Sequence, residues 1–179
     1  MWRDPLVAFR LGREFTPTGQ TGAGRSGGSM LEQVLCRLEV GTGGEGFTDL
    51  TARLNAEIAA SGLQRGIAQL VALHTSCSLT INENADPRVL ADLAAYLQAL
   101  VPQHAVRSLG ADGGSYVYRH DDEGPDDMPA HLRTALTCTS LGLSFDRGRL
   151  LLGQWQAVYL WEHRARPHRR QLSLHLIGQ

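Results

Sequence analysis

The stretch from Leu73 to Pro87 reads Leu-His-Thr-Ser-Cys-Ser-Leu-Thr-Ile-Asn-Glu-Asn-Ala-Asp-Pro. It follows an apolar run and then alternates apolar and polar residues, which predicts a long, half-buried strand over residues 67–81. Its end predicts a helix start, because Asp86 can cap a helix and Pro87 suits the first helical position. Polar side chains buried in such a strand must find hydrogen-bond partners. The density of His, Thr, Ser, Asn and Glu therefore indicates a functional site.

The segments around this stretch predict an α+β fold. An amphipathic helix is expected to end at Gly62, and a second helix to run from Pro87 to Pro102. The irregular segment 103–128 is too long and too rich in Tyr, His and carboxylates for a plain linker. Helices early in the chain and antiparallel strands late indicate the α+β class. The expected strands cover residues 31–40, 67–81, 140–145, 149–163 and 172–176, and the expected helices cover 47–61, 87–101 and a short segment from Pro129 with Leu132, Ala135 and Leu136 facing inward.

Composition limits the classes of function. The chain has 179 residues, of which 42% are hydrophobic and 20% charged, and a net charge of -1. This charge argues against a nucleic-acid-binding surface, and no apolar stretch is long enough for a membrane span or a signal peptide. Cys36, Cys77 and Cys138 are widely spaced beside apolar residues, so we expect inert core thiols. We expect a cytoplasmic protein without nucleic-acid or membrane partners.

The first 29 residues differ from the rest of the chain. From Gly12 to Ser29 the sequence is rich in Gly, Thr and Ser and has no sustained periodicity. Such a segment buries too little apolar surface to offset the entropy of ordering. The predicted organisation is a flexible N-terminal extension over residues 1–29 and a single domain over 30–179. Met30 could be a natural start site.

Three of the seven histidines could carry metal chemistry. His74 follows an apolar strand, His120 lies in the acidic part of the irregular segment, and His131 begins the short helix. Catalytic zinc sites often use three protein ligands, with imidazole the commonest. From the residues alone, three histidines that share no role are the slightly favoured interpretation. A fourth ligand, or a group that orients the imidazoles, could come from the acidic segment, which contains Asp121, Asp122, Glu123, Asp126 and Asp127.

Other polar residues are candidates for substrate contacts. Glu83 could act as a general base, and the amides of Asn82 and Asn84 could hold a substrate, although this run could equally close a turn. Gly153 precedes Trp155 and Gln156 in a predicted strand and could permit close approach of a ligand, although a bulge is equally consistent. A C-terminal basic run could bind phosphate, but a solvated edge is the commoner role for such a run; its members are Arg164, Arg166, Arg169 and Arg170.

Three ordered motifs resemble the YjbQ family, also called UPF0047 and described as secondary thiamine-phosphate synthase. The motifs run from His74 to Pro87, from His120 to His131 and from Gly148 to Gln156. The resemblance extends from about Met30 to the C-terminus. Some branches of the family carry a further histidine where this chain has Pro129, so the full ligand set stays open.

The resemblance implies a sandwich-like antiparallel fold assembled as a homotrimer, with a divalent metal in some members. It implies His74, His120 and His131 as metal ligands, with His74 and Glu83 in catalysis. The ion would be zinc-like at the histidines, or magnesium, which pyrophosphate release more usually employs. The residues implied to contact a small, phosphorylated substrate are Thr75, Ser76, Asn82, Asn84, Trp155 and Gln156.

Three functions follow from these expectations. The implied reaction joins a pyrimidine pyrophosphate to a thiazole phosphate with release of pyrophosphate. A metal-dependent hydrolase is a variant with the same site. A non-catalytic trimer that binds a small metabolite is the third function, and it predicts thermal stabilisation by a ligand without turnover.

Overall fold

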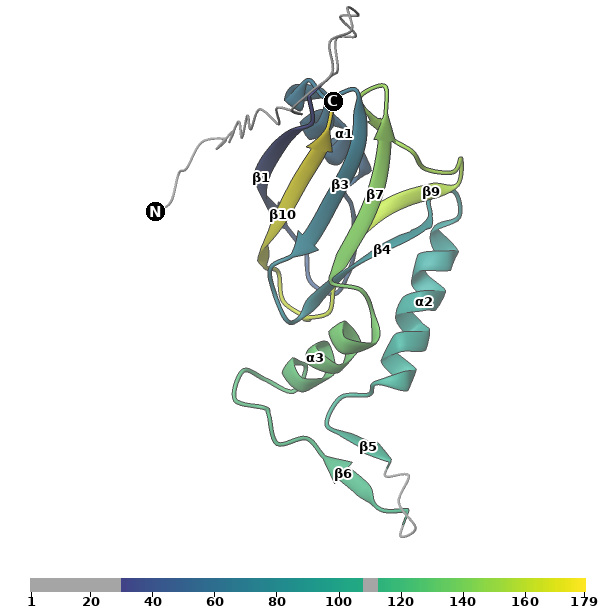
Figure 1. Ribbon diagram of the computed structural model, residues 1–179. Coiled ribbons are helices and arrows are strands. Elements are labelled where there is room, and N and C mark those ends of the chain that lie inside the picture. The colour runs from purple at the N-terminus through teal and green to yellow at the C-terminus, as the bar shows by residue number, and fades with distance from the viewer. Residues whose placement is uncertain (1–29, 108–112) are drawn as a thin grey trace, which may run out of the picture.

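The structure is a computed structural model that describes residues 30–107 and 113–179. The predicted flexible extension, residues 1–29, lies outside the described residues. The described part has the predicted α+β architecture, in which two antiparallel sheets enclose a core and helices pack at one end and along one side (Figure 1). None of the helices in the described ranges is long and apolar enough to cross a membrane.

Two sheets form the sandwich, and a third is a small hairpin. The larger sheet has the strand order β1-β10-β3-β7-β8, the second has the order β2-β9-β4, and β5 pairs with β6. Every pairing between named strands is antiparallel. The strands are β1 Glu32–Gly41, β2 Gly46–Asp49, β3 Arg65–Ala72, β4 Cys77–Glu83, β5 Ala105–Arg107, β6 Ser115–Val117, β7 Ser140–Asp146, β8 Arg149–Leu150, β9 Gln156–Glu162 and β10 Arg169–Gly178.

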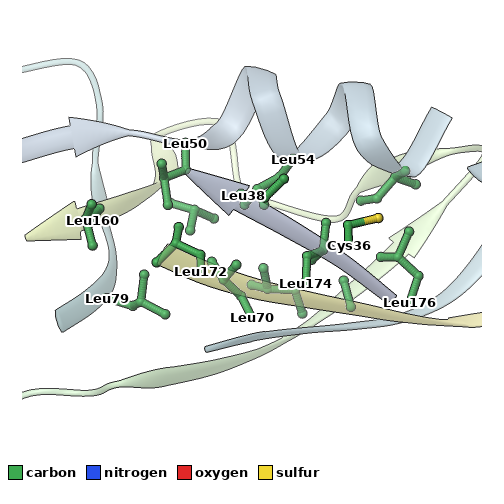
Figure 2. Close-up of a cluster of buried hydrophobic side chains, with 14 of the residues drawn as sticks. Cys36, Leu38, Leu50, Leu54, Leu70, Leu79, Leu160, Leu172, Leu174 and Leu176 are labelled. Atoms are coloured by element: carbon green, nitrogen blue, oxygen red, sulfur yellow. The ribbon is translucent and has the colours of Figure 1, made fainter. Parts of the chain in front are cut away.

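The core lies between the two sheets and beneath helix α1, Thr51–Ser61. Leucines from both sheets point into it, including Leu79 of β4, Leu160 of β9 and Leu172 of β10 (Figure 2). Leu54 and Ile58 of α1 are fully buried against the same cluster. Burying a leucine side chain stabilises the fold by about 1.5–3 kcal/mol. The alternation of apolar and polar residues in the sequence correctly identifies the inward faces of β1 and β10.

The predicted strand over residues 67–81 is wrong, because the chain changes sheets within it. Strand β3 ends at Ala72, and β4 begins at Cys77 in the other sheet. Residues 73–76 form a short connection between them. An apolar run before this connection and alternation after it hid the break, since each half packs on the same core from a different sheet.

The helices agree with the prediction mainly at their capping residues. Gly62 terminates α1 in the left-handed conformation with a φ of 78°. Helix α2, Pro87–Leu100, starts as predicted, since the Asp86 side chain accepts a hydrogen bond from the backbone N–H of Arg88 at 2.9 Å. Helix α1 starts later than predicted, because Phe47 belongs to β2 and pairs with Trp161.

Helix α3, Asp127–Leu136, differs most from its prediction. It starts two residues before Pro129, and it buries the polar residues Asp127, Arg133 and Thr134. Ala135 and Leu136 are exposed, although they were predicted to face inward. Arg133 fixes the helix instead, through hydrogen bonds to the Glu45 carboxylate at 2.7 Å and the Val101 carbonyl at 3.1 Å.

The late strands also differ in their bounds. The predicted strand over residues 149–163 is two strands, β8 and β9, and residues 151–155 between them lie outside any strand. The final strand is longer than predicted, since it pairs with β1 from Arg169 to Gly178. The segment 103–128, predicted to be irregular, contains the small β5–β6 hairpin. Cys36 and Cys77 are buried thiols as expected, but Cys138 is exposed.

Candidate metal centre and adjoining cleft

The connection between β3 and β4 carries the first predicted site residues. His74 and Thr75 are exposed there, whereas Ser76 is buried. The carbonyl of Thr75 accepts a hydrogen bond from Nδ1 of His131 at 3.0 Å. This contact joins the connection to α3, so the change of sheet brings two distant motifs side by side.

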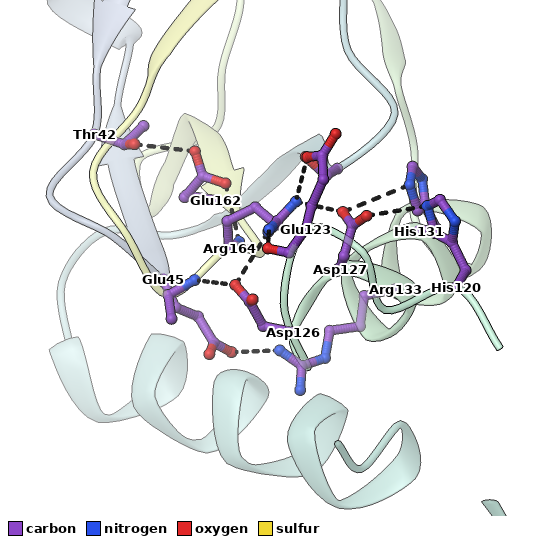
Figure 3. A network of polar contacts seen from close by, with 12 residues as sticks. Thr42, Glu45, His120, Glu123, Asp126, Asp127, His131, Arg133, Glu162 and Arg164 are labelled. Atoms are coloured by element: carbon purple, nitrogen blue, oxygen red, sulfur yellow. Dashed lines mark hydrogen bonds and ion pairs between the residues drawn. The ribbon is translucent and has the colours of Figure 1, made fainter. Parts of the chain in front are cut away.

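His120 and His131 lie next to each other, and both face the Asp127 carboxylate (Figure 3). Nε2 of His120 lies 3.0 Å from Oδ2 of Asp127, and Nε2 of His131 lies 3.7 Å from Oδ1. The two imidazole rings are 5.2 Å apart between centroids. Among the described residues, these three form the group whose ligand atoms all lie within 4.8 Å of one another, and His74 is not a member.

The hydrogen bond to Thr75 fixes the tautomer of His131. A carbonyl oxygen can only accept a hydrogen bond, so Nδ1 of His131 carries a proton and donates it. In the neutral imidazole, Nε2 then has a free lone pair, and this nitrogen faces Asp127. Histidines that bind metals show this arrangement, in which the non-coordinating nitrogen donates to a backbone carbonyl or a carboxylate.

Arg164 holds the acidic segment in place. Its guanidinium bonds the carboxylates of Asp126 and Asp127 and the backbone carbonyl of Glu123, as well as the Glu123 carboxylate at 3.4 Å. Asp126 also accepts from the N–H of Ala165 at 2.8 Å. Burial would raise the pKa of Asp126, but these bonds outweigh it and lower that pKa. Asp127 is 2% exposed, so Arg164 compensates a carboxylate that would otherwise be buried without a cation.

A second buried ion pair lies behind His74. Arg170 and Glu162 are 2% and 0% exposed and share two hydrogen bonds, of 2.6 and 2.5 Å. Glu162 accepts two more, from the Thr42 hydroxyl and the backbone N–H of Arg164. Burial would raise the pKa of Glu162, but the bonds from Arg170 and Arg164 lower it overall. The predicted solvated edge is therefore wrong for Arg164 and Arg170, both of which are buried.

The Arg170 side chain also reaches the His74 connection. Its Nη2 donates to Oγ of Ser76 at 3.0 Å, and that oxygen lies 3.0 Å from Nδ1 of His74. Burial, followed by the charge of Arg170, lowers the pKa of His74. This buried network fixes the position of an exposed imidazole.

An open cleft of about 680 Å³ lies beside the three-residue group. His74 and Thr75 line one part of it, and His131 and Thr134 of α3 line another. The remaining lining residues are small or apolar: Ala72, Leu73, Ala135, Thr137 and Thr139. The volume suits a small metabolite, and hydroxyls and imidazoles are the polar groups that the described lining offers.

The other predicted substrate residues gather elsewhere. The side-chain amide of Asn84 donates to the carbonyl of Gln156 at 3.3 Å, and its backbone N–H donates to the carbonyl of Trp155. Asn82 and Glu83 are at the end of β4, where Glu83 pairs with Gln156. At about 3.3 Å per residue, the two ends of β4 are roughly 20 Å apart. In one chain, this second group therefore does not reach the cleft beside His74.

The model of the family described as UPF0047 protein YjbQ-like matches residues 37–179. The chain belongs to the UPF0047 family. It is 44% identical to the UPF0047 protein sll1880 of Synechocystis over 142 residues, which cover 79% of this chain and 90% of the relative. It is 39% identical to the UPF0047 protein YjbQ of Salmonella typhimurium, over 75% of this chain and 90% of that protein.

Solved structures of other proteins share the fold. The conserved hypothetical protein TT1486 of Thermus thermophilus aligns with a TM-score of 0.64 at 35% identity, over 79% of this chain and 98% of that one. A YbjQ-like protein of unknown function from Sulfolobus solfataricus aligns with a TM-score of 0.70 at 18% identity, over 84% of this chain and 100% of its own. The second likeness concerns the fold alone.

Sequence reasoning on this UPF0047 chain missed part of the site. Asp127 was one of five acidic candidates, and its spacing of four residues from His131 on one helix could have distinguished it. Glu162 and Arg170 carry no comparable signal. They lie in β9 and at the start of β10, and only the fold places their charges opposite each other.

Proposed function

We propose that this protein binds a divalent, zinc-like metal ion at His120, Asp127 and His131, and that it is an enzyme acting on a small substrate in the adjoining cleft. The observation that carries the proposal is the convergence of two imidazole nitrogens on one carboxylate, with His131 in the tautomer that a ligand needs.

The donor set fits this kind of ion. Two imidazoles and one carboxylate are a common ligand set of catalytic zinc, and related transition metals use it as well. Magnesium prefers oxygen ligands, so the two nitrogens argue against it. When bound, the ion would act as a Lewis acid on a phosphoryl or carbonyl oxygen of the substrate.

The chain's own residues position the parts of the site. Arg164 orients the Asp127 carboxylate, and the Thr75 carbonyl orients the His131 ring. The hydroxyl of Thr75 is available to hold a polar group of a substrate in the cleft. Protein groups fixed in advance lower the cost of orienting a substrate.

The first reaction to test is the joining of a pyrimidine pyrophosphate to a thiazole phosphate, because the family resemblance implies it. Arg164 and Arg170 are engaged by buried carboxylates, and the described cleft lining contains neither arginine nor lysine. Neutralisation of a departing pyrophosphate would then depend on the metal ion. The absence of arginine and lysine from the described cleft lining favours a metal-dependent hydrolase as the second candidate. Hydrolysis of a bond with a less highly charged leaving group needs less positive charge than the release of pyrophosphate does. A non-catalytic metabolite-binding trimer is the alternative if no turnover is found.

A homotrimer is part of the proposal. In one chain, Glu83 at the far end of β4 is about 20 Å from Cys77 at its start, and His74 precedes Cys77 by three residues. The residues around Glu83 could contribute to the same site only if a neighbouring copy brings them there. The mass of the protein in solution tests this assembly.

Metal content tests the site itself. The variants are His120→Ala, Asp127→Asn and His131→Ala, and His175→Ala is the matched control because that imidazole lies on β10 and bonds Gln33. We expect tag-free wild-type protein and the control to hold about one zinc-like ion per chain, and the three site variants to lose it. The measurement is elemental analysis, with circular dichroism to check folding.

Wild-type protein that takes up no divalent transition metal would refute the metal site. Metal retained in both histidine variants would refute its location. Turnover of the two candidate substrates is then assayed with the metal-loaded protein, and ligand-induced thermal stabilisation without any turnover would support the metabolite-binding alternative.

A further inference from the structure

His74 differs from His131 in the direction of its hydrogen bonds. Nδ1 of His74 receives the backbone N–H of Ser76 at 3.2 Å. A backbone N–H can only donate, so Nδ1 is the acceptor and carries no proton in this arrangement. In a neutral imidazole, the proton is then on Nε2, which is the reverse of His131.

The ion pair behind Ser76 supports the same direction. A guanidinium has donors and no acceptor, so Arg170 donates to Oγ of Ser76 at 3.0 Å. The single Ser76 hydroxyl proton is then free to point toward Nδ1 of His74, 3.0 Å away. Glu162 receives donors on both oxygens and holds Arg170 in place, so this chain of hydrogen bonds has one polarity from Arg170 to His74.

Both nitrogens of His74 are thereby assigned roles other than metal binding, and His74 is not part of the described group of ligand atoms that converge within 4.8 Å. Nδ1 is engaged as an acceptor, and Nε2 carries a proton where a ligand needs a lone pair. The side chain lines the cleft.

We propose that His74 is a hydrogen-bond donor to substrate through Nε2–H and not a metal ligand, with Ser76 and Arg170 as positioning residues that set its tautomer. The role in substrate binding rests on the proposed function, whereas the tautomer does not. The substrate group must be an oxygen that accepts a hydrogen bond, such as a phosphate, carboxylate or carbonyl oxygen. A neutral imidazole serves as such a donor in other enzymes.

The tautomer is measured first, on metal-free protein, by long-range nitrogen–proton correlation spectra of labelled histidine. His74→Gln identifies the resonances. We expect Nε2 of His74 to be protonated in the wild type, and Ser76→Ala to give a measurable fraction with the proton on Nδ1. Ser78→Ala is the matched control, because Ser78 is only two residues further along, in β4, and its hydroxyl bonds His163. A wild-type protein with the proton on Nδ1 of His74 would overturn the proposal.

Zinc affinity separates this inference from the proposed function. We expect His74→Ala to bind zinc within about twofold of the wild type, while His131→Ala weakens binding by about 100-fold or more. An equal loss in both variants would overturn the inference about His74 and leave the metal site standing. No loss in His131→Ala or His120→Ala would reject the metal site, and the tautomer result would still decide the state of His74.

Inorganic phosphate probes the donor role in the zinc-loaded protein. We expect phosphate to shift the Nε2 resonance of His74, and His74→Ala to weaken phosphate binding by about tenfold, which is typical of one lost hydrogen bond. His74→Gln keeps an N–H donor and should restore part of the affinity. An Nε2 resonance that phosphate leaves unchanged, or equal phosphate affinity in the alanine variant, would overturn the donor role.

Discussion

His163 is a titratable side chain that the fold keeps neutral. It is 1% exposed, and its Nε2 lies 2.8 Å from the hydroxyl of Ser78. Burial, followed by the charge of Arg133, lowers the pKa of His163 to about 4 from an ordinary value of 6.5. Between these two pH values the unfolded chain binds a proton that the folded chain does not, so folding stability must fall as the pH falls.

We therefore predict that the wild type loses about 2 kcal/mol more stability between pH 7 and pH 5 than His163→Gln does. Urea unfolding at both pH values measures the difference, and Glu162 does not interfere because its contribution is lost only at pH values below its ordinary value of 4.5. If the free energy of unfolding changed equally with pH in the two proteins, His163 would not be kept neutral by the fold.

Single residues of the site were predicted from the sequence to different degrees. The sequence identified His120 and His131 by residue type, and the structure brings them together. The prediction of a solvated edge failed for Arg164 and Arg170, because the sequence of an arginine run is the same whether water or buried carboxylates surround the side chains. The partners of these arginines come from distant segments, and local pattern carries no information about them.

At the scale of elements, the pairing of β3 with β10 leaves no room for a side chain at one position. A Cβ at Gly66 would overlap the carbonyl oxygen of Ile177 and would lie 2.7 Å from Cα of Gly178. Gly142, in the neighbouring strand β7, offers ordinary space, since the nearest atom to its Cβ would be the Gln69 side chain at 3.5 Å.

Gly66→Ala is accordingly expected to destabilise the protein by about 2–3 kcal/mol, because backbone must move to accommodate the methyl group. Gly142→Ala should be neutral or slightly stabilising, since it only reduces the freedom of the unfolded chain. Thermal and urea unfolding of the two variants make the comparison. Equal stability would mean that β3 and β10 are less closely paired than described.

The sequence predicted those features of the helices and strands that depend on residues close together in the chain. The Asp86 cap and the Gly62 terminus were predicted because each satisfies backbone groups within a few residues. The break at residues 73–76 was not predicted, because the choice of sheet depends on distant pairing. The polar burial of α3 was missed for the same reason: Arg133 is stabilised by Glu45, far away in sequence.

At the scale of the whole molecule, the two groups of predicted substrate residues lie at opposite ends of β4. A head-to-tail ring of three copies could bring one end of β4 against the other end in the next chain. Sequence could not predict this separation, because His74 and Glu83 are only nine residues apart and look like one site.

The proposed homotrimer predicts a solution mass of three times 19.5 kDa. Light scattering after gel filtration measures it over a range of protein concentrations. A monomeric mass throughout that range would contradict the assembly, and the residues around Glu83 could then not share the cleft with His74.

The Arg164 cluster has a further consequence for ion selection. Three carboxylates contact one guanidinium there, those of Glu123, Asp126 and Asp127, so the cluster carries two uncompensated negative charges. A divalent cation beside Asp127 would make the cluster electroneutral, whereas a monovalent ion would leave repulsion between the carboxylates. Electroneutrality would thus disfavour sodium and potassium even before ligand chemistry discriminates among the divalent ions.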